Sequence, residues 1–431
     1  MKNTLKKIIT YILTVEAKLV LKKYKPKIVA VTGSVGKTST KDAIYTAFLP
    51  FFHVRKSAKS YNSEIGIPVT ILGVENAWSD PKKWAKNIFD GLILILFKKE
   101  YPEWLVLEIG ADRPGDIEKT CKWIKPDISV ITRIGSVPVH VEFYKLVEDV
   151  IKEKSFLAFA VKKDGVLILN SDDEDVLSFK EYSQARTITY GIQNSSSDVR
   201  GTYSQITYDE NGKPTGMSIK ADVIGNSLPI SVSGVLGNQH LYPALAAFAA
   251  AHSENLNLVE VASSFTKHIS APGRMNIIDG IKSSTIIDDT YNASPIALEE
   301  GINILGEVTT KGKKIAILGD MLELGKYSSS EHKRLGELVA KNFDILVAVG
   351  IRAKDYAVGA LEAKMKKSNI LLCDEAKDVP EITKNLIHKG DCIYIKGSQG
   401  MRMERVVKAL MEHPEEASKL LVRQDEEWLS R

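Results

Sequence analysis

The stretch VAVTGSVGKTST, Val29–Thr40, carries the pattern that decides the fold of this 431-residue chain. Small and β-branched apolar residues lead into two glycines, and beyond Lys37 apolar residues recur at the spacing of a helix face. A strand, a glycine loop and a helix in this order allow backbone amides to cradle a phosphate group. The stretch therefore predicts a nucleotide-binding loop within an α/β domain.

The glycine spacing of this loop differs from the common pattern G-x-x-x-x-G-K-[ST], which would put the first glycine at Val31. Here Gly33 stands three positions before Gly36. The loop still has what phosphate binding needs: bare backbone amides, a lysine for the outer phosphates and a hydroxyl for Mg²⁺. We expect nucleotide binding by Gly33, Ser34, Val35, Gly36, Lys37, Thr38 and Ser39.

A second candidate for the same site is Glu108, which ends the otherwise apolar run Trp104–Gly110. Ligands of open α/β sheets bind at the carboxyl ends of the strands, so an acid there is well placed to complete a Mg²⁺ shell. A solvated glutamate at the end of a strand is the alternative.

Further apolar runs predict the rest of a central sheet. Ile128–Ile134 and Gly165–Asn170 have candidate helices between them, which favours a doubly wound, mostly parallel sheet covered on both faces. From Thr187 to Val235 the pattern alternates around an Asn211-Gly212 turn, so we expect a small antiparallel excursion there.

Beyond Ala271 a second series of apolar runs alternates with helical stretches and predicts a Rossmann-like α/β domain. Its expected strands are Thr285–Asp288, Lys314–Leu318, Ile345–Val349, Ile370–Cys373 and Cys392–Ile395. The expected division of the chain is 1–26 for a basic amphipathic segment, 27–270 for an ATP-binding domain and 271–431 for a C-terminal domain.

The composition narrows the class of protein. A formal charge of +4 on 431 residues is too small to indicate a nucleic-acid partner. Three cysteines lie far apart with no C-x-x-C pair, so neither a disulfide framework nor a zinc site is indicated, and a reducing cytoplasm is the simplest expectation. Nothing in the sequence fixes the oligomeric state, and a monomer is the simplest expectation.

The N-terminal segment is the biased part of the chain. Residues 1–27 hold eight lysines and one acid, Glu16, with apolar residues at helical spacing. Lysine and aromatic residues also flank the apolar run GLILILF, Gly91–Phe97. This composition is typical of segments that lie at a membrane surface, and two ordinary helices packed on the protein or on each other are the alternative.

Several motifs in a fixed order resemble the Mur ligase family of ATP-dependent enzymes, which build the peptide of cell-wall precursors. The loop has the family's short form T-G-x-x-G-K-T-[ST] at Thr32–Ser39. Further matching segments are NSEIGIP (Asn62–Pro68), LEIGADRPGDI (Leu107–Ile117), APGRM (Ala271–Met275), DDTYNASP (Asp288–Pro295), LGDMLELG (Leu318–Gly325) and KGSQGMRME (Lys396–Glu404). The resemblance implies two of the family's domains, ATP and Mg²⁺ as cofactors, and a cytoplasmic enzyme of peptidoglycan synthesis.

The same resemblance implies a reaction. The carboxylate of a muropeptide would be phosphorylated by ATP to an acyl phosphate, which D-alanyl-D-alanine or a similar amine would then attack. Such chemistry needs positioning and charge stabilisation more than a protein nucleophile.

Residue roles follow from the positions that match the family's motifs. In the central domain these are Lys37 and Thr38 on the ATP phosphates and first Mg²⁺, Glu108 on that metal, His140 near a second Mg²⁺, and Lys154 as a carbamate that binds metal. Lys152 is a neighbouring candidate for the carbamate. In the C-terminal domain Arg274 would reach the phosphates, and Asp289, Tyr291 and Asn292 would meet the nucleotide, which implies ATP between the domains. Asp320, Glu323 and His332 are candidates to orient the amine, or plain structural residues.

Two departures from the family's pattern leave the substrate open. GNQHLYPALAA, Gly237–Ala247, has Gln239, His240 and Pro243 where the family has other residues, so the adenine contacts there are in doubt. Only 26 residues precede the first expected strand, where the resembled enzymes carry a domain for the UDP end of their substrate. A folylpolyglutamate-type or pseudomurein-type ligase therefore stays open, as does a nucleotide-binding ATPase at the inner membrane surface, attached through the N-terminal segment.

Overall fold

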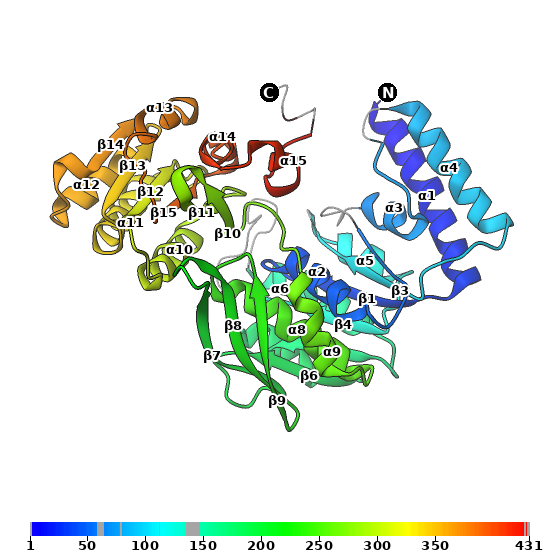
Figure 1. Ribbon diagram of the computed structural model, residues 1–431. Coiled ribbons are helices and arrows are strands. Elements are labelled where there is room, and N and C mark those ends of the chain that lie inside the picture. Colours follow the sequence, from blue (N-terminus) through cyan, green and yellow to red (C-terminus); the bar gives the residue numbers. More distant parts are fainter. Residues whose placement is uncertain are drawn as a thin grey trace. The chain divides into compact units, whose positions relative to one another are not determined.

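The computed structural model describes residues 2–57, 64–77, 80–111, 113–134, 147–425 and 428. They form two compact units (Figure 1). The first comprises Met1–Ser204, Ile219–Ser231 and Leu241–His268, and the second comprises Gln205–Ser218, Val232–His240 and Ile269–Arg431. Mostly parallel sheets and covering helices confirm the predicted α/β class.

The first sheet has the strand order β2-β3-β1-β4-β5-β6-β7-β8-β9. Its strands are β1 (Lys27–Thr32), β2 (Val54–Lys56), β3 (Trp104–Glu108), β4 (Ile128–Ile131), β5 (Val166–Asn170), β6 (Arg186–Gly191), β7 (Val199–Tyr208), β8 (Pro214–Val223) and β9 (Asn226–Ser233). Pairing is parallel from β2 to β7. The short loops 209–213 and 224–225 join β7, β8 and β9 as antiparallel hairpins, because a parallel connection needs a longer crossover.

The antiparallel excursion begins later than the sequence predicts. It was expected from Thr187, but β6 pairs in parallel with β5, with Thr187 opposite Leu167. The misleading alternation comes from a polar residue that is buried: Thr189 is 5% exposed and its hydroxyl donates to Asp198 at 2.8 Å. A satisfied polar side chain inside a sheet gives the same sequence pattern as a half-exposed strand.

Helices cover both faces of the first sheet. They are α1 (Lys2–Tyr24), α2 (Lys37–Phe48), α3 (Gly66–Leu72), α4 (Pro81–Leu96), α5 (Asp116–Cys121), α6 (Val147–Ala160), α7 (Glu174–Ser178), α8 (Leu241–Ser253) and α9 (Leu258–Ser264). On one face, alternate residues of β1 and β3, such as Ala30 and Leu107, pack in one apolar cluster with Leu13 of α1 and Ile67 of α3. The pairs of α2 with α8 and α9 form a separate packed group.

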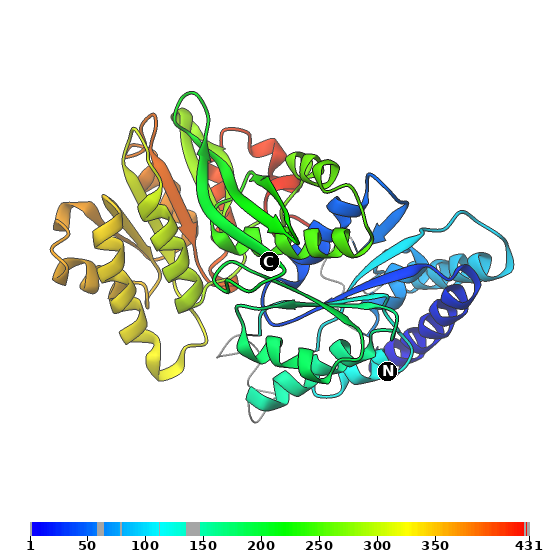
Figure 2. The same cartoon turned by 90° about the horizontal axis from the view of Figure 1, so that it is seen from below.

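The two apolar segments that the sequence singled out are helices that pack on each other. Both views show α1 and α4 side by side (Figures 1 and 2). The run GLILILF forms the C-terminal turns and end of α4, whose start is capped by the Asp80 carboxylate. Within the described ranges, each helix falls short of the length and apolarity that a membrane crossing requires.

The second unit has a sheet of order β10-β11-β15-β12-β13-β14, parallel except for β10. Its elements are β10 (Asn276–Gly280), β11 (Ser284–Asp289), β12 (Lys314–Gly319), β13 (Ile345–Val349), β14 (Ile370–Cys373), β15 (Cys392–Lys396), α10 (Pro295–Glu307), α11 (Ser328–Asn342), α12 (Lys354–Glu362), α13 (Val379–Thr383), α14 (Glu404–Leu410) and α15 (Ala417–Leu420). The strands expected from β11 to β15 are all present. The edge strand β10 was not predicted, since it is short and only partly buried.

Candidate functional site

The glycine loop between β1 and α2 has the backbone that phosphate binding requires. Gly33 has φ 146° and Gly36 has φ 85°, both in the region that favours glycine. A Cβ at Gly33 would lie 2.0 Å from Thr132 Oγ1, whereas a Cβ at Gly36 would meet no atom within 4 Å. Gly33 is therefore required by close packing and Gly36 by its backbone conformation.

The loop is tied to the end of β4. The backbone amides of Ser34 and Val35 donate to the Arg133 carbonyl at 2.8 and 3.1 Å. The Thr132 hydroxyl lies 2.7 Å from the Val35 carbonyl and 3.1 Å from the Thr32 carbonyl. These contacts hold the loop in one shape before any ligand arrives, which lowers the ordering cost of binding.

Thr38 and Glu108 meet beside this loop. β1 and β3 are in register with Val31 opposite Glu108, so the glutamate lies level with the start of the loop. The Thr38 hydroxyl donates to Glu108 Oε2 at 2.9 Å, and Glu108 is 2% exposed. Lys37, one residue earlier, donates to the Ser34 carbonyl at 3.0 Å and thus folds over the loop.

These residues fit Mg²⁺. A hydroxyl and a buried carboxylate in contact are oxygen ligands of the kind that a hard cation prefers, and they lie where a bound triphosphate would supply further oxygens. Across the described ranges, three or more histidine, cysteine or acidic side chains do not gather into a metal cluster.

Burial separates the two lysines proposed for a carbamate. Lys154 on α6 is 5% exposed, whereas Lys152 lies exposed on the same helix. The neighbouring Glu153 accepts hydrogen bonds at 2.7 Å from the amides of Gly115 and Ile117 and so holds the start of α5. His140 lies outside the described residues.

In the second unit, Arg274 and Tyr291 are brought together. The Arg274 guanidinium lies 4.1 Å from the centre of the Tyr291 ring, and the Tyr291 amide donates to the Gly273 carbonyl at 2.9 Å. Tyr291 is 43% exposed, which leaves much of its side chain accessible. The ring therefore holds the guanidinium beside a glycine turn on the surface of the second unit.

Asp289 and Asn292 share Lys396 of β15. Lys396 Nζ lies 2.5 Å from Asp289 Oδ2 and 3.0 Å from the Asn292 carbonyl, and the Tyr394 hydroxyl donates to the same Asp289 oxygen at 3.1 Å. Asp289 is thus held as a buried ion pair. Beside it, burial raises the pKa of Asp288 to about 7, although hydrogen bonds from Thr290 act in the opposite direction.

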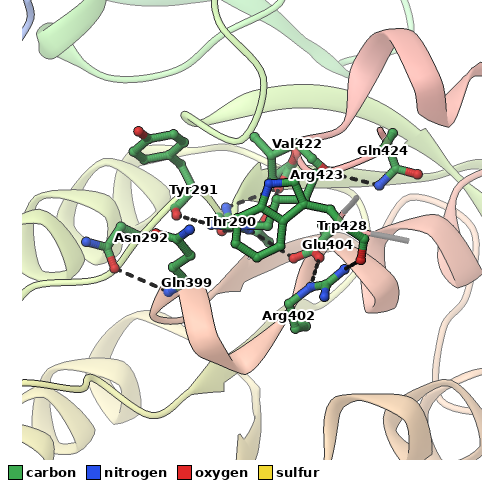
Figure 3. A network of polar contacts seen from close by, with 11 residues as sticks. Thr290, Tyr291, Asn292, Gln399, Arg402, Glu404, Val422, Arg423, Gln424 and Trp428 are labelled. Carbon is green, nitrogen blue, oxygen red and sulfur yellow. Dashed lines mark hydrogen bonds and ion pairs between the residues drawn. The ribbon is translucent and has the colours of Figure 1, made fainter. Parts of the chain in front are cut away.

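A polar network that the sequence did not reveal holds the segment of Thr290 and Tyr291 (Figure 3). Arg423 donates to Glu404 at 3.0 Å, to the Thr290 carbonyl at 3.1 Å and to the Tyr291 carbonyl. Arg402 pairs with the other Glu404 oxygen at 2.6 Å. Only the motif KGSQGMRME, which contains Arg402 and Glu404, carried a signal for it; nothing in the sequence marked Arg423.

Of the three residues predicted to orient the incoming amine, His332 and Asp320 make structural contacts. His332 accepts from the Met321 amide at 3.0 Å through Nε2, and its Nδ1 lies 2.7 Å from the Ser328 carbonyl. Burial lowers the pKa of this histidine, which fits a neutral ring with the proton on Nδ1. Asp320 accepts from the Ala353 amide at 2.7 Å, and Glu323 occupies a positive φ of 66°.

Within the segment GNQHLYPALAA, which departs from the family's pattern, Tyr242 and Pro243 have structural roles at the start of α8. Tyr242, at the start of α8, donates to Asp172 at 2.8 Å, and the amides of Ile192, Gln193 and Asn194 donate to the same carboxylate. Pro243 stands in the first turn of α8, where a proline costs no helical hydrogen bond.

Comparison with known proteins places both units in one family of sequences. The Mur ligase middle domain model matches residues 31–251, and the model described as the glutamate ligase domain of Mur ligases matches residues 273–399. No N-terminal domain model of the same family matches the chain.

Individual relatives agree with this match. The UDP-N-acetylmuramoyl-tripeptide–D-alanyl-D-alanine ligase of Bacillus subtilis is 30% identical over 399 residues, covering 92% of this chain and 79% of the relative. The Escherichia coli ligase of the same name is 25% identical over 396 residues, covering 90% and 77%. The MurF ligase from Thermotoga maritima, solved in complex with ADP, superposes with a TM-score of 0.71 at 26% identity, covering 93% of this chain and 83% of that chain.

Proposed function

Because the chain belongs to the Mur ligase family, we propose that it joins D-alanyl-D-alanine, or an amine of the same kind, to the carboxylate of a muropeptide. The matched relatives are ATP-dependent, ADP-forming ligases, which confirms the predicted family and enzyme class. The acid and the amine are proposed from the relatives, and the observation that carries the proposed use of Mg²⁺-ATP is the contact of Thr38 with the buried Glu108 beside the glycine loop.

The reaction runs in two steps. The substrate carboxylate attacks the γ-phosphorus of ATP, which forms an acyl phosphate and releases ADP. The amine then attacks the acyl carbon, loses a proton, and phosphate leaves as the amide bond forms. Lys37 and loop amides other than those of Ser34 and Val35, which donate to the Arg133 carbonyl, hold the outer phosphates in line for the first step, so the protein contributes positioning and charge neutralisation.

We further propose that Thr38 and Glu108 hold Mg²⁺, which would neutralise phosphate charge when bound. A carbamate on Lys154 would add a carboxylate-like ligand, and the predicted role of His140 remains a proposal of the same kind. Arg274, Asp289, Tyr291 and Asn292 are proposed to contact the nucleotide from the second unit. The enzyme is proposed to act as a monomer in the cytoplasm on a peptide-bearing cell-wall precursor, with peripheral contact to the inner membrane surface.

Phosphate release tests this function. The full chain is incubated with Mg²⁺-ATP, candidate muropeptide acids and D-alanyl-D-alanine, singly and together. Release that requires both an acid and the amine supports ligation, and a glutamate-terminated folate or another acid replaces the muropeptide in parallel. ATP turnover that ignores both acid and amine would reject the ligase and favour the nucleotide-binding ATPase.

Glu108→Gln tests the metal role. The variant keeps the shape and a hydrogen-bond acceptor for Thr38 but removes the charge, so we expect turnover to fall by about two orders of magnitude and to need more Mg²⁺. The control Glu118→Gln changes an exposed acid on α5 and keeps wild-type turnover. An unchanged Mg²⁺ dependence in Glu108→Gln would show that Glu108 does not bind the metal.

A further inference from the structure

The geometry points to a second property of the first unit: we propose that α1 and α4 together form a docking face for an anionic lipid bilayer. This proposal deepens the peripheral membrane contact proposed above by naming the residues and the lipid charge that make it, and it does not depend on which acid or amine is joined. It rests on the exposed apolar side chains of the two helices, on the lysines around them, and on a basic pocket at the edge of α1.

Each helix carries an exposed apolar stripe. We call the combined set the apolar face: Leu5, Ile8, Tyr11, Val15 and Leu19 on α1, with Phe89, Leu92, Leu96 and Phe97 on or directly after α4. Their exposed fractions range from 38% for Val15 to 72% for Leu96. Spacings of three and four residues put the five side chains of α1 on one side of that helix, and Phe89, Leu92 and Leu96 on one side of α4, while Phe97 follows α4 with an extended backbone.

The two stripes lie on the same side of the helix pair. The helices run in parallel, because Glu16 faces Gly91 and Lys23, farther along α1, donates to the carbonyls of Leu94, Ile95 and Phe97 at the end of α4. Val15 directly precedes Glu16, whereas Leu92 directly follows Gly91. Each residue is rotated by about 100° about the helix axis from the one before it, so Val15 and Leu92 are rotated in opposite directions from the contact between Glu16 and Gly91. In two parallel helices that lie side by side, these opposite rotations point both side chains to the same face of the pair.

Lysines surround the apolar face. Lys18 and Lys22 lie on the outer side of α1, Lys82 and Lys86 on the outer side of α4, and Lys98 and Lys99 follow Phe97; all six are exposed. The acids of the two helices offset one of these six lysines. Asp90 is paired with Lys86 at 2.8 Å, and Glu16 is turned inward, 4% exposed.

The edge of α1 opens into a basic pocket of about 420 Å³. Lys18, Lys22 and Lys25 of the N-terminal segment line it together with Lys125 and with Lys162, which is paired with the Asp127 carboxylate at 2.6 Å. Lys18 also lies 5.7 Å from the centre of the Trp123 ring, which forms part of the wall. Lysine ammonium groups around an open pocket suit the phosphate of a lipid headgroup.

Charge decides between the possible occupants. A second copy docked through the same face would bring lysine rims against each other, since a two-fold interface pairs a surface with itself. An anionic bilayer instead offers acyl chains to the apolar face and negative headgroups to the lysines around it, as for amphipathic helices at membranes.

Sedimentation with vesicles tests the proposal on the full chain. Wild-type protein should bind phosphatidylcholine vesicles that contain phosphatidylglycerol, bind pure phosphatidylcholine weakly, and lose affinity as ionic strength rises. Ile8→Ser combined with Phe89→Ser should lower partitioning about tenfold or more. Lys22→Gln and Lys82→Gln should each lower it about fivefold.

Matched controls change similar residues elsewhere. Ile351→Ser with Leu361→Ser alters exposed apolar residues of the second unit, and Lys341→Gln with Lys408→Gln removes two exposed lysines there. All variants should keep the wild-type melting temperature and phosphate release in solution, so that loss of vesicle binding is not loss of folding or of ligase activity.

Results of two kinds, from vesicle binding and from the oligomeric state, would overturn the proposal. One is a wild-type chain that stays in the supernatant with anionic vesicles at low ionic strength, or a serine variant that binds them as the controls do. The other is a wild-type dimer by light scattering that becomes monomeric in Ile8→Ser with Phe89→Ser while vesicles bind neither form, which would make the face a contact between copies.

Discussion

Among single residues, Lys154 is the one whose role depends most on its surroundings. Its ammonium group is buried on α6, where a carbamate would replace a cation by a carboxylate-like metal ligand. We expect Lys154→Ala to lower turnover by about two to three orders of magnitude, with partial rescue by formate or acetate. Phosphate release with and without the added carboxylate measures this.

The control for this lysine is its exposed neighbour on the same helix. Lys152→Ala should keep turnover within about twofold of the wild type, because surface substitutions away from a site have small effects. Wild-type rates in Lys154→Ala would reject the carbamate role.

Glu16 gives a prediction about pH. Both of its carboxylate oxygens are buried and have no hydrogen-bond partner among the described residues, and burial raises its pKa from 4.5 to about 7. The folded state therefore holds a proton that the unfolded state has lost between these values, so stability contributed by Glu16 is present below pH 4.5 and is lost as the pH rises through about 7.

Glu16→Gln removes this titration while keeping the side-chain shape next to Gly91. Between pH 5 and 8 we expect the free energy of unfolding of the wild type to fall relative to the variant by up to about 3 kcal/mol. Denaturant unfolding at each pH measures the difference, with Glu362→Gln on α12 as an exposed control. Parallel pH profiles for wild type and Glu16→Gln would contradict the prediction.

The residues of the candidate site differ in how far the sequence could reveal them. Lys37, Thr38 and Glu108 follow from local pattern, because each stands at a fixed place relative to a strand or loop. Arg423 and Glu153 act through contacts with segments 133 and 36 residues away in sequence, and no periodicity reports such contacts. Burial, which separates Lys154 from Lys152, likewise appears only in the folded chain.

At the scale of elements, the C-terminal segment after α15 holds the turn that carries Tyr291. The Glu404 carboxylate is buried between Arg402 and Arg423, and Arg423 also binds two carbonyls of that turn. Arg423→Met should cost about 2–3 kcal/mol in the free energy of unfolding, because the buried carboxylate loses one of two partners. It should also raise the KM for ATP more than it lowers kcat.

Arg405→Met is the matched control, since Arg405 is an exposed arginine on α14. It should change the free energy of unfolding by about 0.5 kcal/mol or less. A KM for ATP that stays at the wild-type value in Arg423→Met, despite the lost stability, would separate this segment from nucleotide binding.

Some helices and strands could be predicted from the sequence pattern and others could not. Long apolar runs locate β1, β3 to β5 and β11 to β15, because strands buried on both faces need continuous apolar sequence. β6 was placed in the antiparallel part because buried Thr189 resembles an exposed position, and the edge strand β10 was missed. The side-by-side packing of α1 and α4 could be anticipated only as one of two alternatives, since amphipathicity does not name the surface that a helix covers.

At the scale of the whole molecule, the parallel strands β1 to β6 and one buried apolar cluster belong to the first unit, and the strands β10 to β15 and another cluster belong to the second, while the hairpin strands β7, β8 and β9 have residues in both. Units built in this way can unfold in separate transitions, so calorimetry of the full chain should give more than one two-state step. A ligand that binds only the folded form stabilises it by about 2.7 kcal/mol at one hundred times its dissociation constant. The unfolding transition whose temperature rises when nucleotide is added therefore identifies the unit that binds the nucleotide.

With a nonhydrolysable ATP analogue and Mg²⁺, we expect both transitions to shift upward by a few degrees, because residues of both units are proposed to contact the nucleotide. Lys37→Ala should abolish both shifts. Arg274→Ala should keep the shift of the first unit and reduce that of the second. If only the first transition moves in the wild type, then Arg274, Asp289, Tyr291 and Asn292 do not bind the nucleotide, and the proposed site reduces to the glycine loop and its partners on β3 and α6.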